Sequence, residues 1–203
     1  MKNEKQIVLF LKKNTEYNPT QLGAKINQKF NNLGLPIILP NNYTKDNQPL
    51  IIFNQGILNM TITINDVSFT FLEKNKNDIA DLLIDIVSFL EDNELNFNRM
   101  GYVSSYYQTK KEREFFKDKM IKEKNKICND FQIAWYEEQL IDSVKVNFWE
   151  RHLTDFYNNV EFLTIFDINT PADQDYNINS CFLQDFLKKC DKFLELKIKE
   201  FTK

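Results

Sequence analysis

The chain has 203 residues, and a chain of this length buries roughly 70% of its unfolded surface, enough to fold without a disulfide or a metal. Its 26 Lys and Arg side chains and 29 Asp and Glu side chains are interspersed and give a net charge of −3. Proteins that bind duplex nucleic acid usually concentrate basic side chains on one surface, so the composition disfavours generic nucleic-acid binding.

The N-terminal region predicts a buried strand followed by a capped helix. Residues 6–12 form an apolar run flanked by charge, which is typical of a buried strand and too short for a signal peptide or a membrane span. Asn18 followed by Pro19 is typical of a helix N-cap and first helical residue. We expect a helix from 19 to about 32, since apolar residues then recur every fourth position. Two short strands follow, at 35–40 and 49–54.

A β-hairpin is the clearest local prediction. Apolar and polar residues alternate on both sides of Asn65-Asp66, a dipeptide that suits a two-residue hairpin turn. Antiparallel pairing around this turn places one apolar row on a buried face: Ile64 opposite Val67, Ile62 opposite Phe69, and Met60 opposite Phe71. Thr61 and its polar neighbours then point to the other face.

The remaining elements follow from the same periodicities. Asn77 is expected to cap a helix that ends near residue 91, because apolar residues recur at helical spacing after it. The expected elements of the second half are a strand at 97–108, a helix at 109–126, strands at 131–138, 144–152 and 160–169, and a final helix at 183–201.

These elements predict an α+β fold made of two similar halves. Residues 1–94 and residues 95–203 each read as strand, helix, several strands and helix. We expect a mostly antiparallel sheet with helices packed on one face. Because the junction between the halves is short and lacks Gly, Ser and Pro, we expect the halves to pack as one compact unit.

His152 is the only histidine of the chain, and it is the candidate for a catalytic residue. Glu150 or Asp155 would orient its ring for general base catalysis. A hydrolase centred on His152 or on Asp167, which ends an apolar strand, is therefore one alternative. A solvent-exposed histidine at a strand end explains the same residue equally well.

Other catalytic and ligand-binding motifs are missing from the sequence. It contains no Ser nucleophile motif and no glycine-rich phosphate loop. Cys128, Cys181 and Cys190 lie outside any CxxC pattern, so we expect free thiols, with Cys190 as a core residue of the last helix. We expect no cofactor and no metal.

Tyr102, Tyr106 and Tyr107, with Arg99 nearby, form the candidate binding site. Aromatic side chains next to a cation are typical of surfaces on which single-stranded nucleic acid stacks. The Lys-rich segment 110–126 adds basic side chains after this strand. A nucleic-acid-binding module is therefore a second alternative, and core or interface packing is the other explanation of these tyrosines.

The second half resembles the C-terminal part of a sporadically distributed, uncharacterised bacterial protein family. The resemblance rests on Met100-Gly101-Tyr102-Val103, on the apolar strand that ends in Phe166-Asp167-Ile168, and on the helix from Leu183 to Phe201. It covers about half of the chain. It implies an α+β fold and no assigned activity, and it therefore transfers no catalytic residue.

The leading functional prediction is a non-enzymatic, cytoplasmic protein that binds another protein. Such a protein fits an accessory or inhibitor factor of a phage or mobile element. The mildly acidic balance suits a partner with a basic groove, for example a nucleic-acid-handling enzyme. The aromatic content, 14% of all residues, is also high for one core, so we expect a homodimer. Because the N-terminal apolar run is too short for a membrane span, we expect no membrane partner.

Overall fold

The computed structural model describes residues 3–39, 48–108, 132–155 and 160–201. Its strands are β1 (Glu4–Leu11), β2 (Ile37–Ile38), β3 (Ile51–Phe53), β4 (Leu58–Ile62), β5 (Asp66–Leu72), β6 (Phe97–Gln108), β7 (Gln132–Ile141), β8 (Val144–Asp155) and β9 (Val160–Asn169). Its helices are α1 (Pro19–Lys29), α2 (Lys76–Asp92) and α4 (Ser180–Phe201), with 3₁₀ turns η1 (Asn31–Leu33) and η2 (Glu73–Asn75).

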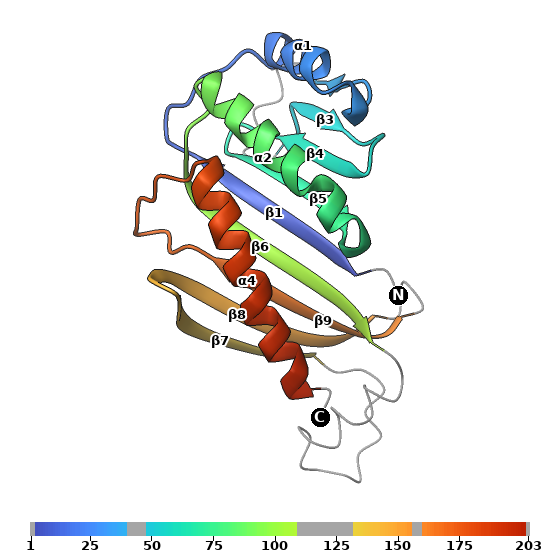
Figure 1. Ribbon diagram of the computed structural model, residues 1–203, viewed down its shortest axis with the longest axis vertical. Helices are drawn as coiled ribbons and strands as arrows, with labels where there is room; N and C mark the ends of the chain where they lie inside the picture. The colour runs from blue at the N-terminus through green and yellow to red at the C-terminus, as the bar shows by residue number, and fades with distance from the viewer. Residues whose placement is uncertain (1–2, 40–47, 109–131, 156–159, 202–203) are drawn as a thin grey trace.

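The strands form one nine-stranded antiparallel sheet in the order β2-β3-β4-β5-β1-β6-β9-β8-β7. The middle of the sheet is the pair β1 and β6, in which Ile7 lies opposite Tyr102. This pair joins residues 1–94 and 95–203 in one continuous sheet (Figure 1). The α+β class and the mainly antiparallel sheet are therefore confirmed, whereas the structural repeat of the two halves stays a prediction.

Helices α2 and α4 cross the same face of the sheet, which we call the covered face (Figure 1). Each presents an apolar stripe to the strands, because buried residues recur at helical spacing. The stripes are Ile79, Leu83, Ile86, Val87 and Leu90 in α2, and Leu183, Phe186, Cys190 and Leu194 in α4. None of the described helices is long and apolar enough to cross a membrane.

The predicted start of α1 is confirmed in detail. The Asn18 side chain accepts a hydrogen bond of 3.1 Å from the backbone N–H of Gln21, and Pro19 is the first helical residue. The helix ends earlier than expected, at Lys29, and a 3₁₀ turn continues the chain to Gly34. Helix α2 begins at Lys76, directly after a 3₁₀ turn, so Asn77 lies inside the helix and is not its cap.

In the second half, the strands predicted at 97–108 and 160–169 coincide with β6 and β9. The strands β7 and β8 form an antiparallel hairpin, and both are longer than their periodicity indicated. The final helix begins at Ser180, where Asn179 accepts a hydrogen bond from the backbone N–H of Phe182. The helix expected at 109–126 lies outside the described residues.

The hairpin of β4 and β5 is present, but its predicted register is wrong by two residues. Ile62 pairs with Val67 and Met60 pairs with Phe69. A shift of two residues keeps every side chain on its predicted face, because successive side chains of a strand alternate. Apart from Ile64, the apolar row therefore lies in the core as expected, with different cross-strand partners.

Thr63 explains the shift, since it closes the turn one residue earlier than expected. Its Oγ1 accepts hydrogen bonds from the backbone N–H groups of Asn65 and Asp66, at 3.1 and 3.0 Å. The hydroxyl of Tyr17 donates to the Thr63 carbonyl at 2.6 Å. The two-residue turn is consequently Ile64-Asn65, and Ile64, predicted to be buried, is 45% exposed.

The hairpin provides a test of which residues support the core. Phe69 is fully buried, so Phe69→Ala should lower the free energy of unfolding by roughly 3–5 kcal/mol. Thr61 lies on the opposite face of β4, and Thr61→Ala should cost below about 1 kcal/mol. Urea melts of both variants measure the difference. Equal losses would contradict the assignment of the two faces.

Candidate binding sites on the two faces of the sheet

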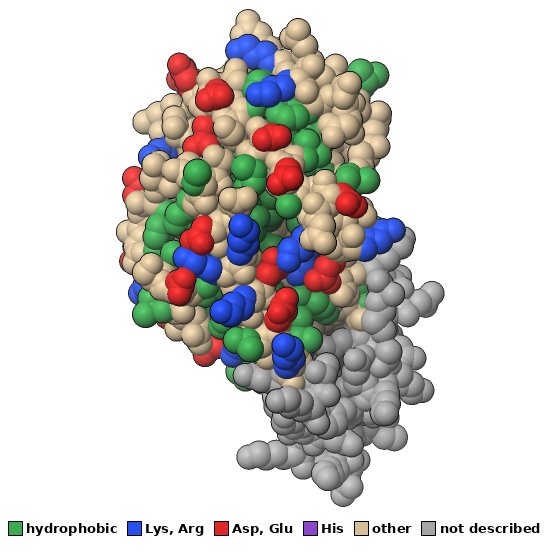
Figure 2. Space-filling model, in the orientation of Figure 1, with side chains coloured by type: hydrophobic (Ala, Val, Ile, Leu, Met, Phe, Trp, Pro, Cys, Tyr) green, Lys and Arg blue, Asp and Glu red, His purple; other side chains and the backbone are tan. Residues whose placement is uncertain are grey.

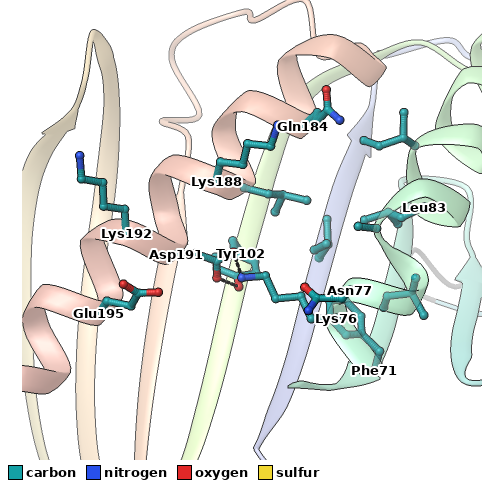
Figure 3. A pocket seen from close by; sticks show the side chains of 15 residues that line it. Phe71, Lys76, Asn77, Leu83, Tyr102, Gln184, Lys188, Asp191, Lys192 and Glu195 are labelled. Atoms are coloured by element: carbon teal, nitrogen blue, oxygen red, sulfur yellow. Dashed lines mark hydrogen bonds and ion pairs between the residues drawn. The ribbon is translucent and has the colours of Figure 1, made fainter. Parts of the chain in front are cut away.

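A groove lies between α2 and α4 on the covered face. Its cavity has a volume of about 400 Å³. Ile7, Phe71 and Tyr102 form its floor on β1, β5 and β6, and the two helices form its walls (Figure 3). The apolar side chains of the walls are Ile79, Ala80, Leu83 and Ile84 from α2 and Leu187 from α4.

Asp191 of α4 joins both walls and the floor of this groove. Its carboxylate accepts a hydrogen bond of 2.6 Å from the Tyr102 hydroxyl and forms an ion pair with Lys76 of α2 (Figure 3). The Nζ of Lys5 lies 3.8 Å from the same carboxylate. Lys76 is in the first turn of α2, where the helix dipole disfavours a cation. The negative charge of Asp191 offsets this disadvantage.

Lys5 is the most unusual residue of the group, because its side chain is only 1% exposed. Its Nζ donates a hydrogen bond of 3.0 Å to the Tyr106 hydroxyl and lies 3.3 Å from Glu73. It also lies over the rings of Tyr102 and Tyr106, at 5.4 and 5.0 Å from their centroids. A buried ammonium group requires partners of this kind, because leaving water without them is costly. We call Lys5, Glu73, Lys76, Tyr102 and Asp191 the Asp191 cluster.

Burial fixes the protonation states around this cluster. Burial, together with the negative charge of Asp191, raises the pKa of Tyr102 far above its usual value. Tyr102 therefore remains a hydroxyl donor at every physiological pH. The adjacent Cys190 is fully buried, a core residue as the sequence predicted, and this burial raises the pKa of its thiol. Cys181, by contrast, is exposed on the same helix.

The mouth of the groove carries additional charges. Lys188, Lys192 and Glu195 line it on α4. Figure 2 shows basic and acidic side chains intermixed over this face, with apolar side chains visible between them. Within the part of the chain that the structure describes, Lys188 and Lys192 have no ion-pair partner.

The structure separates the four residues of the candidate stacking site. Tyr102 and Tyr106 point to the covered face, where they contact Lys5. Tyr107 and Arg99 point to the opposite face, because side chains of a strand alternate. There, the guanidinium carbon of Arg99 lies 4.7 Å from the centroid of the Phe10 ring. The Lys-rich segment 110–126 lies outside the described residues.

His152 is buried within the sheet, so the expectation of an exposed strand-end histidine is wrong. Its side chain is 0% exposed. Its Nε2 lies 2.7 Å from the Glu150 carboxylate, and its Nδ1 lies 2.9 Å from Oγ1 of Thr164. With Nε2 protonated and donating to Glu150, the neutral ring accepts a hydrogen bond from the Thr164 hydroxyl at Nδ1. Glu150 is thus the orienting carboxylate that the sequence indicated.

Asp167, the other residue of the hydrolase alternative, faces away from His152. Asp167 pairs with Trp149 on β8, whereas Thr164 pairs with His152. The two pairs are an odd number of positions apart, so their side chains point to opposite faces of the sheet. Burial raises the pKa of Asp167, while a hydrogen bond from Asn169 and the charge of Arg151 partly oppose this shift. Among the described residues, no group of three His, Cys, Asp or Glu side chains is placed to hold a metal ion.

The face opposite α2 and α4, which we call the open face, carries an aromatic patch on β7 and β8. The patch consists of Tyr136, Trp149 and Arg151. The two rings lie 4.8 Å apart and are 48% and 37% exposed. The Arg151 guanidinium lies 5.6 Å from the Trp149 centroid and 3.6 Å from the Asp167 carboxylate.

The Asp191 cluster allows a stability prediction. Asp191→Ala removes one of the two carboxylates beside the buried Lys5 ammonium and leaves the Tyr102 hydroxyl without its acceptor, which together should cost roughly 3 kcal/mol. Asp185 lies on the same helix in an exposed pair with Lys189, so Asp185→Ala is a matched control with an expected cost below about 1 kcal/mol. Urea denaturation measures both. Similar losses in the two variants would show that the cluster contributes no more than a surface ion pair.

Comparison of the chain with protein-family models, with curated proteins and with solved structures finds no match in any of the three. The function is therefore inferred from the geometry of these two faces, and the family resemblance of the second half stays a prediction.

Proposed function

We propose that this chain is a non-enzymatic binding protein that acts through protein–protein interaction, and that the aromatic patch is its contact surface. The observation that carries this proposal is the grouping of an exposed Tyr, an exposed Trp and an Arg on one sheet face. Residues of these three types dominate the energetic hot spots of protein interfaces. Their rings bury large areas while immobilising few rotatable bonds.

The position of the patch supports the same proposal. Tyr136 and Trp149 lie directly opposite each other on β7 and β8, and the Tyr136 hydroxyl donates a hydrogen bond of 3.0 Å to Asn147. The side chains are therefore held by a regular two-stranded ladder before any partner arrives. Such preorganisation lowers the entropic cost of binding.

The wider proposal follows the composition of the chain. A net charge of −3 suits a partner with a basic groove, such as a nucleic-acid-handling enzyme. We propose that the protein is an accessory or inhibitor factor of a phage or mobile element that binds such a partner.

We place the protein in the cytoplasm. We also propose a homodimer, since β2 and β7 form the edges of the described sheet and strand edges pair readily. The two halves are proposed to be a structural repeat.

Capture of a partner tests the patch. The purified chain, used as bait in an extract of its native host, should enrich a protein whose recovery falls at least about tenfold with Trp149→Ala. Leu196→Ala is the matched control, because Leu196 is an exposed apolar residue of α4. Quantitative mass spectrometry compares the three baits. Equal recovery with Trp149→Ala and the unaltered chain would refute the patch as the contact surface.

A hydrolase is the second candidate, and one observation favours it. The chain of contacts from Glu150 through His152 to Thr164 has the order of carboxylate, imidazole and hydroxyl that activates a nucleophile. In such a mechanism His152 would take the proton from the Thr164 hydroxyl while Glu150 stabilises the imidazolium. All three residues are buried, which supports a structural network over an accessible nucleophile.

Substitution of His152 separates the two candidates. In the binding protein, His152→Ala should leave the activity of folded protein within about a few-fold of the unaltered chain, because the His152 side chain is buried and lies outside the aromatic patch. The variant also leaves Glu150 and Thr164 without their shared partner, so circular dichroism must first confirm that it folds. A folded His152→Ala protein without any activity in a host assay would make the hydrolase the leading candidate.

A further inference from the structure

We propose that the groove between α2 and α4 binds a small monocarboxylate with an apolar body, such as a medium-chain aliphatic acid. This inference concerns the covered face and does not rest on the aromatic patch or on a protein partner. Three observations carry it: the apolar lining of the groove, the excess of lysine at its mouth, and the way in which the Asp191 cluster shares its charges.

The apolar body of the ligand would contact the walls and floor of the groove. The cavity of about 400 Å³ falls within the roughly 300–1,000 Å³ that is typical of small-molecule sites. Six aliphatic side chains and the ring of Phe71 line it, and the polar lining residues Asn77 and Gln184 lie among them. Transfer of an alkyl chain from water to such a lining is favourable in proportion to the apolar area that is buried.

The charges at the groove select for an anion. Three lysines line it, Lys76, Lys188 and Lys192, against two carboxylates, Asp191 and Glu195. The groove therefore has an excess of one positive charge in a chain whose net charge is −3. Local fields of this kind attract ligands of the opposite charge and repel those of like charge. A single carboxylate matches the excess.

The Asp191 cluster also leaves Lys76 available to a ligand. Lys76 is partly exposed at the groove, whereas Asp191 also has the Tyr102 hydroxyl and the Lys5 ammonium as partners. When a ligand carboxylate enters, Lys76 can turn from Asp191 towards it. Asp191 then keeps two of its three partners, so the exchange leaves no buried charge unpaired. Lys188 on the opposite wall supplies the second cation.

Binding of three probes with the same tail tests the inference. Decanoate, decylamine and decanol, each below its critical micelle concentration, are titrated into the purified chain by calorimetry. Decanoate should bind saturably with one site per chain, and at least about tenfold more tightly than decylamine, because the amine meets like charge. Decanol should lie between them. Equal affinity of the three probes, or no saturable binding of decanoate, would overturn the proposal.

Two sets of variants locate the bound probe. Ala80→Trp fills the groove from α2 and should abolish decanoate binding, while Ala24→Trp places the same side chain on the exposed surface of α1 and should not change it. Lys188→Glu combined with Lys192→Glu should weaken the binding of decanoate and strengthen the binding of decylamine. An unfolded variant would lose the binding of both probes, so this exchange of preference cannot arise from loss of folding. Unchanged decanoate affinity with Ala80→Trp, or with the double charge reversal, would place the probe elsewhere and refute the groove as the site. Thermal melts confirm the folding of each variant.

Discussion

Burial of the Lys5 ammonium group is the constraint on which the covered face depends. An ammonium group that is only 1% exposed is shielded from bulk solvent, so hydroxyl, carboxylate and aromatic partners must converge on it. They come from η2, α4 and β6, elements that are far apart in the sequence. The requirement fixes α4 over the middle of the sheet, and Lys76 of α2 is drawn to the same carboxylate. The groove lies between these two helices, which both contact the Asp191 carboxylate or carry it.

Most of the secondary structure could be predicted from the sequence, because a long strand or helix repeats its pattern of apolar residues several times. The apolar run of β9 and the alternation of β6 predicted both strands to the residue. Asn18 predicted the start of α1 because its cap requires only the adjacent backbone. Gly101, a residue of the family resemblance, has a reason that only the paired strand β9 reveals: a Cβ there would lie 2.4 Å from Oδ1 of Asn169.

Features that depend on neighbours distant in the sequence were not predictable in the same way. The turn between β4 and β5 is a local exception, because the Thr63 hydroxyl accepts hydrogen bonds from the backbone N–H groups of Asn65 and Asp66, and the prediction from the Asn-Asp dipeptide did not include this contact. The burial of His152 is decided by Thr164 on the next strand. For the Asp191 cluster, the sequence offers one indication: Lys5 lies two residues before Ile7 on β1, so both side chains point to the same face of the strand. This spacing places the lysine on the apolar face, but it does not indicate which carboxylate forms an ion pair with it.

The central place of β1 has a consequence for synthesis on the ribosome. The ribosome makes β1 well before β6, yet one of the two hydrogen-bonding edges of β1 pairs with β6, which starts at Phe97. Until β6 has been made, the edge of β1 that pairs with β6 has no native partner. The opposite edge of β1 can already pair with β5. An exposed edge beside the apolar Ile7 and Leu9 is prone to pair with other nascent chains. The charged flanks Glu4, Lys5 and Lys12 limit this pairing until β6 arrives.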